Sequence, residues 1–484
     1  RTSANPLLVF SCLRSSTLPC ARAFTILRGG SMSEMAVSLA SSPPSVLPGD
    51  LSLVEHTLTV PLDYAAPASG TTSLFVREMC MASKRSDEKL PFLLYLQGGP
   101  GFPAGRPSVP PSGWQKAALE KYRVLLLDQR GTGRSAAVTT ESLAAYANPE
   151  DQADFLSHFR ADSIVRDCEL IRTHIAGGQQ LTLLGQSFGG FCILSYLSLA
   201  PAGVERALFT FGLAPVGCSA EDVYRATFKR MEYRNKRYYT RYPADVDLVR
   251  RIVSLLHASA AQLPRGGTLT PRRFLQLGLL LGSASGLEAL HDLLELARSP
   301  TGEVDSLPQH FLLAVEQAQQ HFETNPIYWL LHEAIYCDGP GTASCWAAER
   351  VQASLGEAWD YTCCLSPTSP PIQFTGEMVY SWMGEDYAWL RPLQQAAEIL
   401  AQKDDWGRLY DEQALRAGVS PCAALISYDD IYVERACSEA TVEMLGGFPR
   451  VRTWVSNEFQ HSGLRDQPSV FEKLLAMSKG ELEH

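Results

Sequence analysis

The pentapeptide Gly185-Gln186-Ser187-Phe188-Gly189 carries the strongest signal for the fold of this chain. It has the form G-x-S-x-G, follows the apolar run 181–184 (LTLL) and precedes the apolar, helix-length segment 188–200. A strand, a sharp turn and a helix in this order hold a serine hydroxyl clear of a sheet, because the flanking glycines leave room for a strained backbone. The pattern predicts Ser187 as a nucleophile, with the N–H of Phe188 open beside it. The alternative is an ordinary strand–loop–helix connection.

A general base is expected further along the chain, because in this arrangement the acid and the histidine follow the serine. Seven of the ten histidines lie beyond Ser187, and only His461 and His484 fall in the last hundred residues. His484 is the terminal residue, where fraying is expected. His461 comes just after the strand-like run 451–455, so it occupies a loop at the end of a strand. We therefore predict His461 as the base, and a solvated loop histidine is the alternative.

An acid that orients this histidine is predicted in the segment 428–432 (YDDIY), which follows the buried strand-like run 422–427. A carboxylate at this place can fix the imidazole and stabilise the imidazolium that forms when it takes the serine proton. Two adjacent aspartates leave a choice, since side chains one residue apart in an extended segment point in opposite directions. We favour Asp430, with Asp429 as the alternative.

A second glycine cluster, residues 98–101 (GGPG), follows the strand-like residues 92–94. Such a loop can aim backbone N–H groups at a developing oxyanion, so the N–H of Gly99 is predicted to act jointly with that of Phe188. Glycine-rich turns after strands also bind phosphates, but this loop has neither the form G-x-G-x-x-G nor a G-K-[ST] ending. The sequence therefore disfavours nucleotide binding.

Three strings in this order resemble those of the proline iminopeptidases, also called prolyl aminopeptidases, of the α/β-hydrolase fold. They are LQGGPGF (residues 96–102), DQRGTGRS (128–135) and GQSFGG (185–190). The resemblance runs from about residue 53 to about residue 475. Gln97 replaces the histidine that many members carry, as in the longer subgroup. Shorter members have their acid before a hydrophobic residue, which favours Asp430, followed by Ile431, over Asp429.

This resemblance implies a serine exopeptidase that releases N-terminal residues, preferentially proline, from peptides with a free N-terminus. The reaction would pass through an acyl-enzyme on Ser187, with His461 and Asp430 as partners and with no metal or organic cofactor. An esterase or amidase of the same fold is the alternative, because a triad and an oxyanion hole do not by themselves select peptides. A non-catalytic binding protein of this fold is a further alternative.

Members that release proline hold the substrate's free amine with glutamates from the cap and its neighbourhood. Two segments of this chain are similar to those that carry them, namely 331–336 (LHEAIY) and 374–378 (FTGEM). Glu333 and Glu377 are therefore predicted to bind the substrate. A pair of carboxylates suits this task, since a protonated amine gains charge-assisted hydrogen bonds where the acceptors are negative and shielded from water.

The expected fold class is α/β, with a mostly parallel sheet, helices on both faces and an inserted helical cap. Asp430 lies 430 − 187 = 243 residues after Ser187, far more than one crossover needs, and residues 220–350 are mostly patterned as amphipathic helix. We divide the chain into a flexible extension (1–49), the first part of the core (50–215), the cap (216–375) and the second part of the core (376–484).

Composition limits the partners and the compartment. A net charge of −10 argues against a nucleic-acid partner. The chain has no uninterrupted apolar segment of about twenty residues, so we expect no membrane span.

The cysteines bear on the compartment. Twelve cysteines without a C-x-x-C pair indicate reduced thiols rather than a zinc site, which favours the cytoplasm. Arginines and serines with no acid before Glu34 resemble a transit peptide, so a mitochondrion or plastid is the alternative, unless Met32 is the true start. The oligomeric state is not readable.

Overall fold

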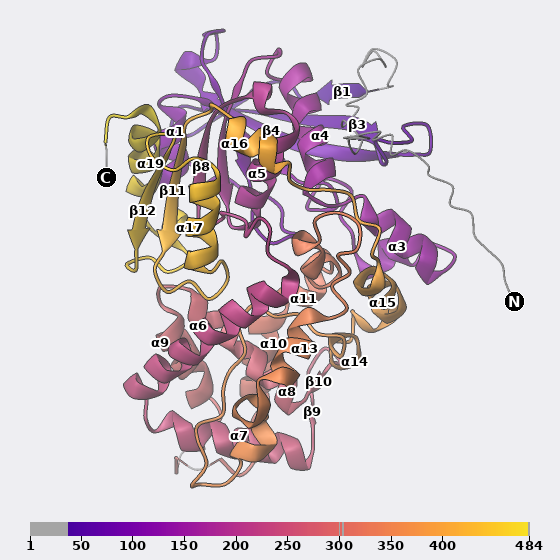
Figure 1. Ribbon diagram of the computed structural model, residues 1–484, viewed down its shortest axis with the longest axis vertical. Coiled ribbons are helices and arrows are strands. Elements are labelled where there is room, and N and C mark those ends of the chain that lie inside the picture. The colour runs from indigo at the N-terminus through magenta and orange to yellow at the C-terminus, as the bar shows by residue number, and fades with distance from the viewer. Residues whose placement is uncertain (1–36, 300, 303, 483–484) are drawn as a thin grey trace, which may run out of the picture. The chain divides into compact units, whose positions relative to one another are not determined.

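The computed structural model describes residues 37–299, 301–302 and 304–482. A ten-stranded sheet has the order β1-β3-β4-β6-β5-β7-β8-β11-β12, with β2 paired to β3 (Figure 1). Pairs from β6 to β12 are parallel, whereas those that involve β1 to β4 are antiparallel. The strands are β1 (Ser38–Ser41), β2 (Ser45–Leu47), β3 (Leu51–Pro61), β4 (Thr71–Met81), β5 (Phe92–Leu96), β6 (Arg123–Asp128), β7 (Leu181–Gln186), β8 (Val204–Thr210), β11 (Cys422–Ser427) and β12 (Val451–Ser456).

Helices cover both faces of this sheet. Leu93 packs in one core with α1 (Gly113–Leu119) and α19 (Ser469–Lys479), whereas Leu94 packs in the other with α4 (Ala161–His174) and α5 (Phe188–Leu199). Successive side chains of a strand point to opposite faces, so a strand covered on both sides is apolar throughout. This explains the continuous apolar runs before each predicted turn, and the predicted α/β core is confirmed.

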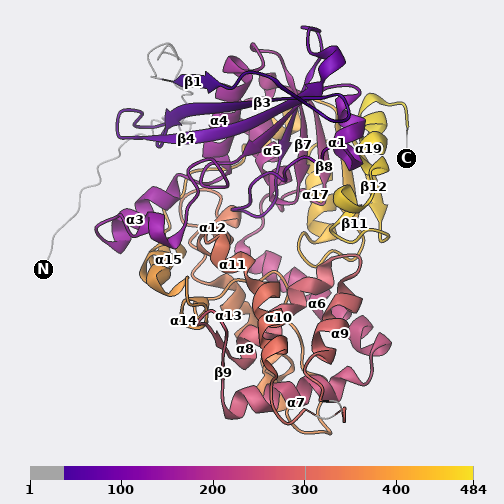
Figure 2. The same cartoon turned by 180° about the vertical axis from the view of Figure 1, so that it is seen from behind.

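The chain between β8 and β11 forms a mostly helical part that lies below the sheet in Figures 1 and 2. Its longest helix, α6, begins with a capping box in which the Ser219 side chain accepts from the N–H of Asp222. No helix in the described residues is both long and apolar enough to cross a membrane. The helices here are α6 (Ala220–Arg241), α7 (Asp245–Ala258), α8 (Pro271–Leu275), η4 (Gln276–Gly282), α9 (Gly286–Glu295), α10 (Gln309–Gln319), α11 (His321–Thr324), α12 (Ile327–Leu331), η5 (Glu333–Tyr336), α13 (Ala347–Ser354), η6 (Gly356–Trp359), η7 (Tyr361–Cys364), α14 (Met383–Asp386), η8 (Arg391–Leu393), α15 (Gln394–Gln402) and α16 (Glu412–Ala417).

The remaining elements are short and lie in the connections. A two-stranded sheet pairs β9 (Ala261–Gln262) with β10 (Thr268–Leu269) inside the cap. The other helices are η2 (Ala82–Lys84), α2 (Thr140–Leu143), α3 (Pro149–Ser157), η3 (Pro201–Gly203), α17 (Arg435–Met444) and α18 (Gly463–Asp466). Helix α3 packs against α15, so the chain just before β11 also reaches the core.

The predicted division of the chain stays a prediction, with two differences in detail. The helical insertion continues past the predicted cap end at residue 375, because no strand of the main sheet occurs in the described residues between β8 and β11. Most of the expected flexible extension, 1–49, lies outside the described residues, as does His484. The last part of this extension differs from the expectation, since β1 and β2 pair with β3 at the sheet edge.

The segment 128–135 joins loops at one edge of the sheet. The carboxylate of Asp128 accepts from the N–H of Ala104 (3.1 Å) and of Arg134 (2.9 Å). Arg130 donates to both carboxylate oxygens of the buried Asp167, at 2.7 and 2.6 Å. The bond to Ala104 ties the loop after β6 to the chain that follows the glycine loop, and the bonds of Arg130 tie it to α4.

Candidate active site

Ser187 lies at a strained turn between β7 and α5. Its backbone angles are φ 53° and ψ −125°, in the left-handed region that residues with a Cβ rarely adopt. The turn is held on both sides, because the N–H of Ser187 donates to the carbonyl of Thr210 (2.9 Å) and its own carbonyl accepts from Gly190 (2.7 Å). The predicted strand–turn–helix context of the serine is therefore present.

Glycine is required around this turn because backbones approach closely there. A Cβ at Gly189 would lie 2.0 Å from the carbonyl oxygen of Leu96, and one at Gly212 would lie 2.2 Å from that of Ser187. Neither neighbour is a flexible side chain that can move away. Glycine at 189 is thus required because the turn packs against the end of β5, and glycine at 212 because the chain after β8 packs against Ser187.

The loop after β5 contacts the serine directly. A Cβ at Gly98 would lie 2.9 Å from the Cβ of Ser187 and 3.6 Å from its Oγ. Gly99 follows with φ +130°, a conformation open to glycine. Phe188 is the first residue of α5, where backbone N–H groups have no partner within the helix. Of the two predicted oxyanion donors, Phe188 follows Ser187 directly, and Gly99 follows the glycine that packs against Ser187.

The structure brings Asp430, not Asp429, to His461. Nδ1 of His461 lies 2.8 Å from Oδ2 of Asp430, and the other oxygen of Asp430 accepts from the N–H of Tyr432 (2.8 Å) and Val433 (3.0 Å). Asp429 instead accepts from Asn457 at 2.9 Å and lies 3.3 Å from Arg237. These separate partners resolve the geometric choice between the two aspartates.

His461 is partly buried beside the turn that carries Ser187. Its carbonyl accepts from Gln186 Nε2 (3.2 Å), the residue before Ser187, and its ring packs edge-to-face on Tyr432 with centroids 4.8 Å apart. An ionised carboxylate can only accept, so Nδ1 carries the proton shared with Asp430 and Nε2 is an acceptor. Nε2 has no partner among the described residues. It is therefore available to take a proton.

The pKa of His461 is raised by its acidic neighbours. Burial lowers this pKa, but the charge and hydrogen bond of Asp430 and the charge of Glu377 outweigh burial, against a smaller opposing effect of Arg465. An imidazolium at this place is thus stabilised, which is the form that His461 would take after accepting a proton.

Glu377 lies near this pair and inside a group of tyrosines. Its carboxylate accepts from the hydroxyl of Tyr328 at 2.6 Å. Burial raises the pKa of Glu377 to about 7, although the bond from Tyr328 and the charge of His461 lower it, and Asp430 raises it further. A partly buried carboxyl that titrates near neutrality beside a histidine–aspartate pair is a feature typical of functional sites.

Glu333, the other glutamate predicted to bind the substrate, has partners of its own in the cap. Its two carboxylate oxygens accept from the N–H groups of Ala347 and Ala348, each at 3.0 Å, at the start of α13. Free N–H groups at a helix N-terminus favour a negative partner, so Glu333 caps this helix. The similarity of the segment 331–336 to family sequences did not predict this capping role, because a sequence match does not show where the Glu333 side chain points.

Three polar residues near Glu377 were missed by the sequence reasoning. Both ring nitrogens of His332 and the hydroxyl of Tyr224 are buried without a partner in the described part of the chain. Burial lowers the pKa of His332 to about 3, so this imidazole is neutral at pH 7. Tyr328 and His332 stand four residues apart, the spacing that places two side chains on one helix face, and their rings lie 4.9 Å apart. This four-residue spacing is the feature of the sequence from which Tyr328 and His332 could have been predicted to lie together.

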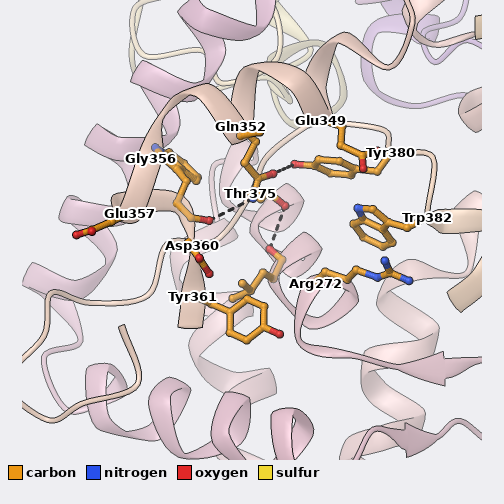
Figure 3. Close-up of a pocket in the computed structure, with 13 residues that line it drawn as sticks. Arg272, Glu349, Gln352, Gly356, Glu357, Asp360, Tyr361, Thr375, Tyr380 and Trp382 are labelled. Atoms are coloured by element: carbon orange, nitrogen blue, oxygen red, sulfur yellow. Dashed lines mark hydrogen bonds between the residues drawn. The ribbon is translucent and has the colours of Figure 1, made fainter. Parts of the chain in front are cut away.

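A separate cleft in the cap has a volume of about 510 Å³ and contains none of the predicted site residues (Figure 3). The hydroxyl of Tyr380 donates to Gln352 (2.7 Å), and Tyr380 stacks on Trp382 with centroids 4.9 Å apart. Arg272 lies over the ring of Trp382 and donates to Asp386 at 2.9 Å. Four of the side chains that line this cleft, Arg272, Gln352, Tyr380 and Trp382, therefore already have partners in the cap.

The chain is similar to several known proteins. A family described as the alpha/beta hydrolase fold matches residues 91–255. A protein named proline iminopeptidase from Aeromonas sobria is 44% identical over 442 residues, covering 91% of this chain and 99% of the relative. A proline iminopeptidase of Aspergillus aculeatus is 34% identical over 443 residues, covering 90% and 96%. The solved structure of a Mycobacterium smegmatis proline iminopeptidase covers 88% of this chain and 100% of its own, with 14% identity and a TM-score of 0.39.

The sheet order, the elbow and the matched region define a protein of the α/β-hydrolase fold. An identity of 44% over nearly the full length of a relative identifies one family within this fold. The chain belongs to the proline iminopeptidase family.

Proposed function

We propose that this protein is a serine exopeptidase that releases N-terminal residues, preferentially proline, from peptides with a free N-terminus. The observation that carries the proposal is the carboxyl of Glu377 beside the His461–Asp430 pair. A triad alone serves many acyl transfers, whereas a carboxylate next to it offers a place for a substrate cation. The names of the relatives agree with this reading.

The proposed reaction is acyl transfer in two halves. Ser187 attacks the carbonyl of the N-terminal residue while Nε2 of His461 takes the hydroxyl proton, and Asp430 stabilises the imidazolium. The N–H groups of Gly99 and Phe188 stabilise the oxyanion. His461 then gives the proton to the departing peptide nitrogen. Water, deprotonated by the same histidine, attacks the acyl-enzyme and releases the amino acid.

Recognition of the substrate's amine is assigned to Glu377 rather than to Glu333. The carboxylate of Glu333 already accepts two backbone N–H bonds, whereas that of Glu377 accepts one bond from Tyr328. An ionised carboxylate has room for further donors, so Glu377 can accept from the protonated amine of proline. His332 and Tyr224, which lack partners in the described chain, offer neutral hydrogen-bonding groups nearby.

Hydrolysis of three substrates tests this function: a prolyl chromogenic amide, its N-acetylated form and a simple acyl ester. Wild type is expected to cleave only the free-amine amide efficiently. Ser187→Ala is expected to lower kcat about 10⁴-fold or more, because the nucleophile is lost while binding remains. Equal or faster cleavage of the blocked amide or the ester would assign a general esterase or amidase instead.

The cytoplasm is the proposed compartment. All ten cysteines in the described residues are unbridged, including two exposed ones, which fits a reducing environment. Cell fractionation with an antibody against the protein checks this location. Recovery in mitochondria or plastids would instead support a targeting role for the N-terminal segment.

A further inference from the structure

Two cysteines that are far apart in the sequence, Cys218 and Cys437, have their side chains next to each other. They are separated by 437 − 218 = 219 residues, and their thiols are hydrogen-bonded to one another. Cys218 lies in the chain between β8 and α6, and Cys437 lies in the first turn of α17. Both residues are partly exposed, so a small solute can reach them. The proposed peptidase reaction uses neither thiol.

Hydrogen bonds along α17 hold the chain after β8 beside this helix. The hydroxyl of Thr441 donates to the carbonyl of Ala214 at 2.6 Å, and that of Ser438 donates to the carbonyl of Leu213 at 3.5 Å. Thr441 stands four residues after Cys437, a spacing that places both side chains on one face of the helix. The helix itself lies against β11 of the sheet (Figure 1). The backbone around the thiol pair is therefore held in place.

The thiol pair lies where the core meets the first helix of the cap. Glu434 caps α17, because its carboxylate accepts from the N–H groups of Ala436 (2.6 Å) and Cys437 (3.1 Å). The same carboxylate accepts from Arg230 of α6 at 2.6 and 2.8 Å. The first turn of α17 is thus already joined to α6 by an ion pair, and a bond between the two sulfurs ties the chain just before α6 to the same turn.

The environment of these two thiols differs from that of most cysteines in this chain. Six of the ten cysteines in the described residues are buried, and burial raises the pKa of Cys168, Cys192 and Cys422. A hydrogen bond from the thiol of Cys437 instead lowers the pKa of Cys218 to about 7, against the opposing effect of partial burial. The same contact raises the pKa of Cys437. At neutral pH the pair therefore shares one proton, with the thiolate on Cys218, and a thiolate is the form that attacks an oxidant.

A metal site does not explain the pair. Thiolates are good ligands for zinc, but a zinc site in a protein takes three or four protein ligands. Nowhere in the part of the chain that the structure describes do three or more His, Cys, Asp or Glu side chains form a group that could hold a metal ion. The remaining chemistry of two adjacent thiols, one of them ionised, is oxidation.

We propose that Cys218 and Cys437 form an oxidation-sensitive pair that closes to a disulfide when the protein meets hydrogen peroxide. The Cys218 thiolate attacks one peroxide oxygen, the O–O bond breaks, and the second oxygen leaves as hydroxide, which takes a proton to become water. Cys218 is then a sulfenic acid. The sulfur of Cys437 loses its proton and attacks this sulfenic sulfur, so the S–S bond forms, the S–O bond breaks and a second water leaves. Two thiols are oxidised and one peroxide is reduced, independently of any peptidase activity.

Peptide mapping of the wild-type protein tests the disulfide. The protein is treated with hydrogen peroxide, its remaining thiols are alkylated, and it is digested without reductant. We expect the peptides of Cys218 and Cys437 to be joined, with a mass two hydrogens below the sum of the free peptides, and to separate on reduction. The exposed Cys345, which has no such partner thiol, should still be mostly alkylated. Free Cys218 and Cys437 at a peroxide concentration that oxidises Cys345 would overturn the proposal.

Three variants test the role of each thiol. Cys437→Ser keeps a hydroxyl that can donate to Cys218 but removes the second sulfur, so the sulfenic acid on Cys218 should accumulate and be trapped by dimedone. Cys218→Ser should give no dimedone adduct on Cys437. Cys345→Ser is the matched control and should form the wild-type bridge. An adduct on Cys437 but none on Cys218 would overturn the assignment. Thermal unfolding shows whether each variant is folded, and if Cys437→Ser is not, the peptide map of the wild type decides.

Discussion

The sheet core and the helical cap contribute to the site in different ways. Ser187, Asp430 and His461 each follow the carboxyl end of a strand, β7, β11 and β12, and these strands run parallel. Parallel strands end at one edge, so three residues far apart in sequence meet there. The cap instead places Glu377 and Tyr328 near the histidine–aspartate pair, from a connecting segment and a short helix. We therefore expect the chemistry to depend on sheet topology and the selectivity to depend on how the irregular segments of the cap pack over it.

The two predicted glutamates of the cap region also differ in what they contact. Glu333 stabilises the start of α13, whereas Glu377 lies near the residues of the core edge. Both are acidic residues of the cap region in segments similar to those of the family, but their side chains have unlike partners. The core and the cap should therefore respond differently to substitution.

The largest effect is expected for Asp430→Asn in the core. An amide cannot hold the imidazole in the tautomer that leaves Nε2 free, so kcat should fall about 10³–10⁴-fold with little change in KM. Asp429→Asn is the matched control, because Asp429 bonds to Asn457 and Arg237 instead of His461. Steady-state kinetics on prolinamide measure both. A larger loss from Asp429→Asn would reverse the assignment of the acid.

Glu377→Gln is expected to have the next largest effect. Loss of a charged acceptor for the substrate amine costs about 1.5–3 kcal/mol, which is roughly 10–100-fold in kcat/KM. The change should appear with prolinamide and be absent with a simple acyl ester, since an ester without an amine makes no such bond. Equal losses on the two substrates would show that Glu377 acts on His461 rather than on the amine.

The pH dependence of binding should follow Glu377, whose pKa is raised to about 7. A cationic amine binds the ionised form, so affinity should rise about tenfold between pH 6 and 8. Calorimetric titration of Ser187→Ala with prolinamide measures this without turnover, and Ser187→Ala with Glu377→Gln should give a flat profile.

The raised pKa of Glu377 also makes the free energy of unfolding depend on pH. The folded protein binds this proton more tightly than the unfolded chain, for which the pKa is 4.5. The contribution of Glu377 to stability therefore falls as the pH rises from about 4.5 to about 7. A rise over this interval that disappears in Glu377→Gln would contradict the raised pKa.

The smallest effect on activity is expected for Glu333→Gln. This change weakens the cap of α13, so the free energy of unfolding should fall by about 1–2 kcal/mol while kcat/KM on prolinamide stays within about twofold. Thermal unfolding and steady-state kinetics together test it. A tenfold rise in KM with unchanged stability would return Glu333 to the amine site.

Most of the core could be predicted from the sequence, because its signals are local. The run 181–184, the glycines around Ser187 and the loop 98–101 each combine a strand with a sharp turn, and the structure has them in that order. The cap was predicted only as helical. Its short helices and connecting segments carry no strong periodicity, so neither Tyr328 nor His332 was singled out, although their four-residue spacing was visible.

The turn at Ser187, the order of serine, acid and histidine, and the need for glycine beside Ser187 could be read from the chain alone, since they follow from chain order and from backbone sterics over a few residues. The folded structure was needed to show that Asp430 rather than Asp429 meets His461, that Glu333 caps α13, and that Tyr432 packs on His461. The direction of each of these side chains is set by contacts with segments distant along the chain, and no short stretch of sequence contains both partners.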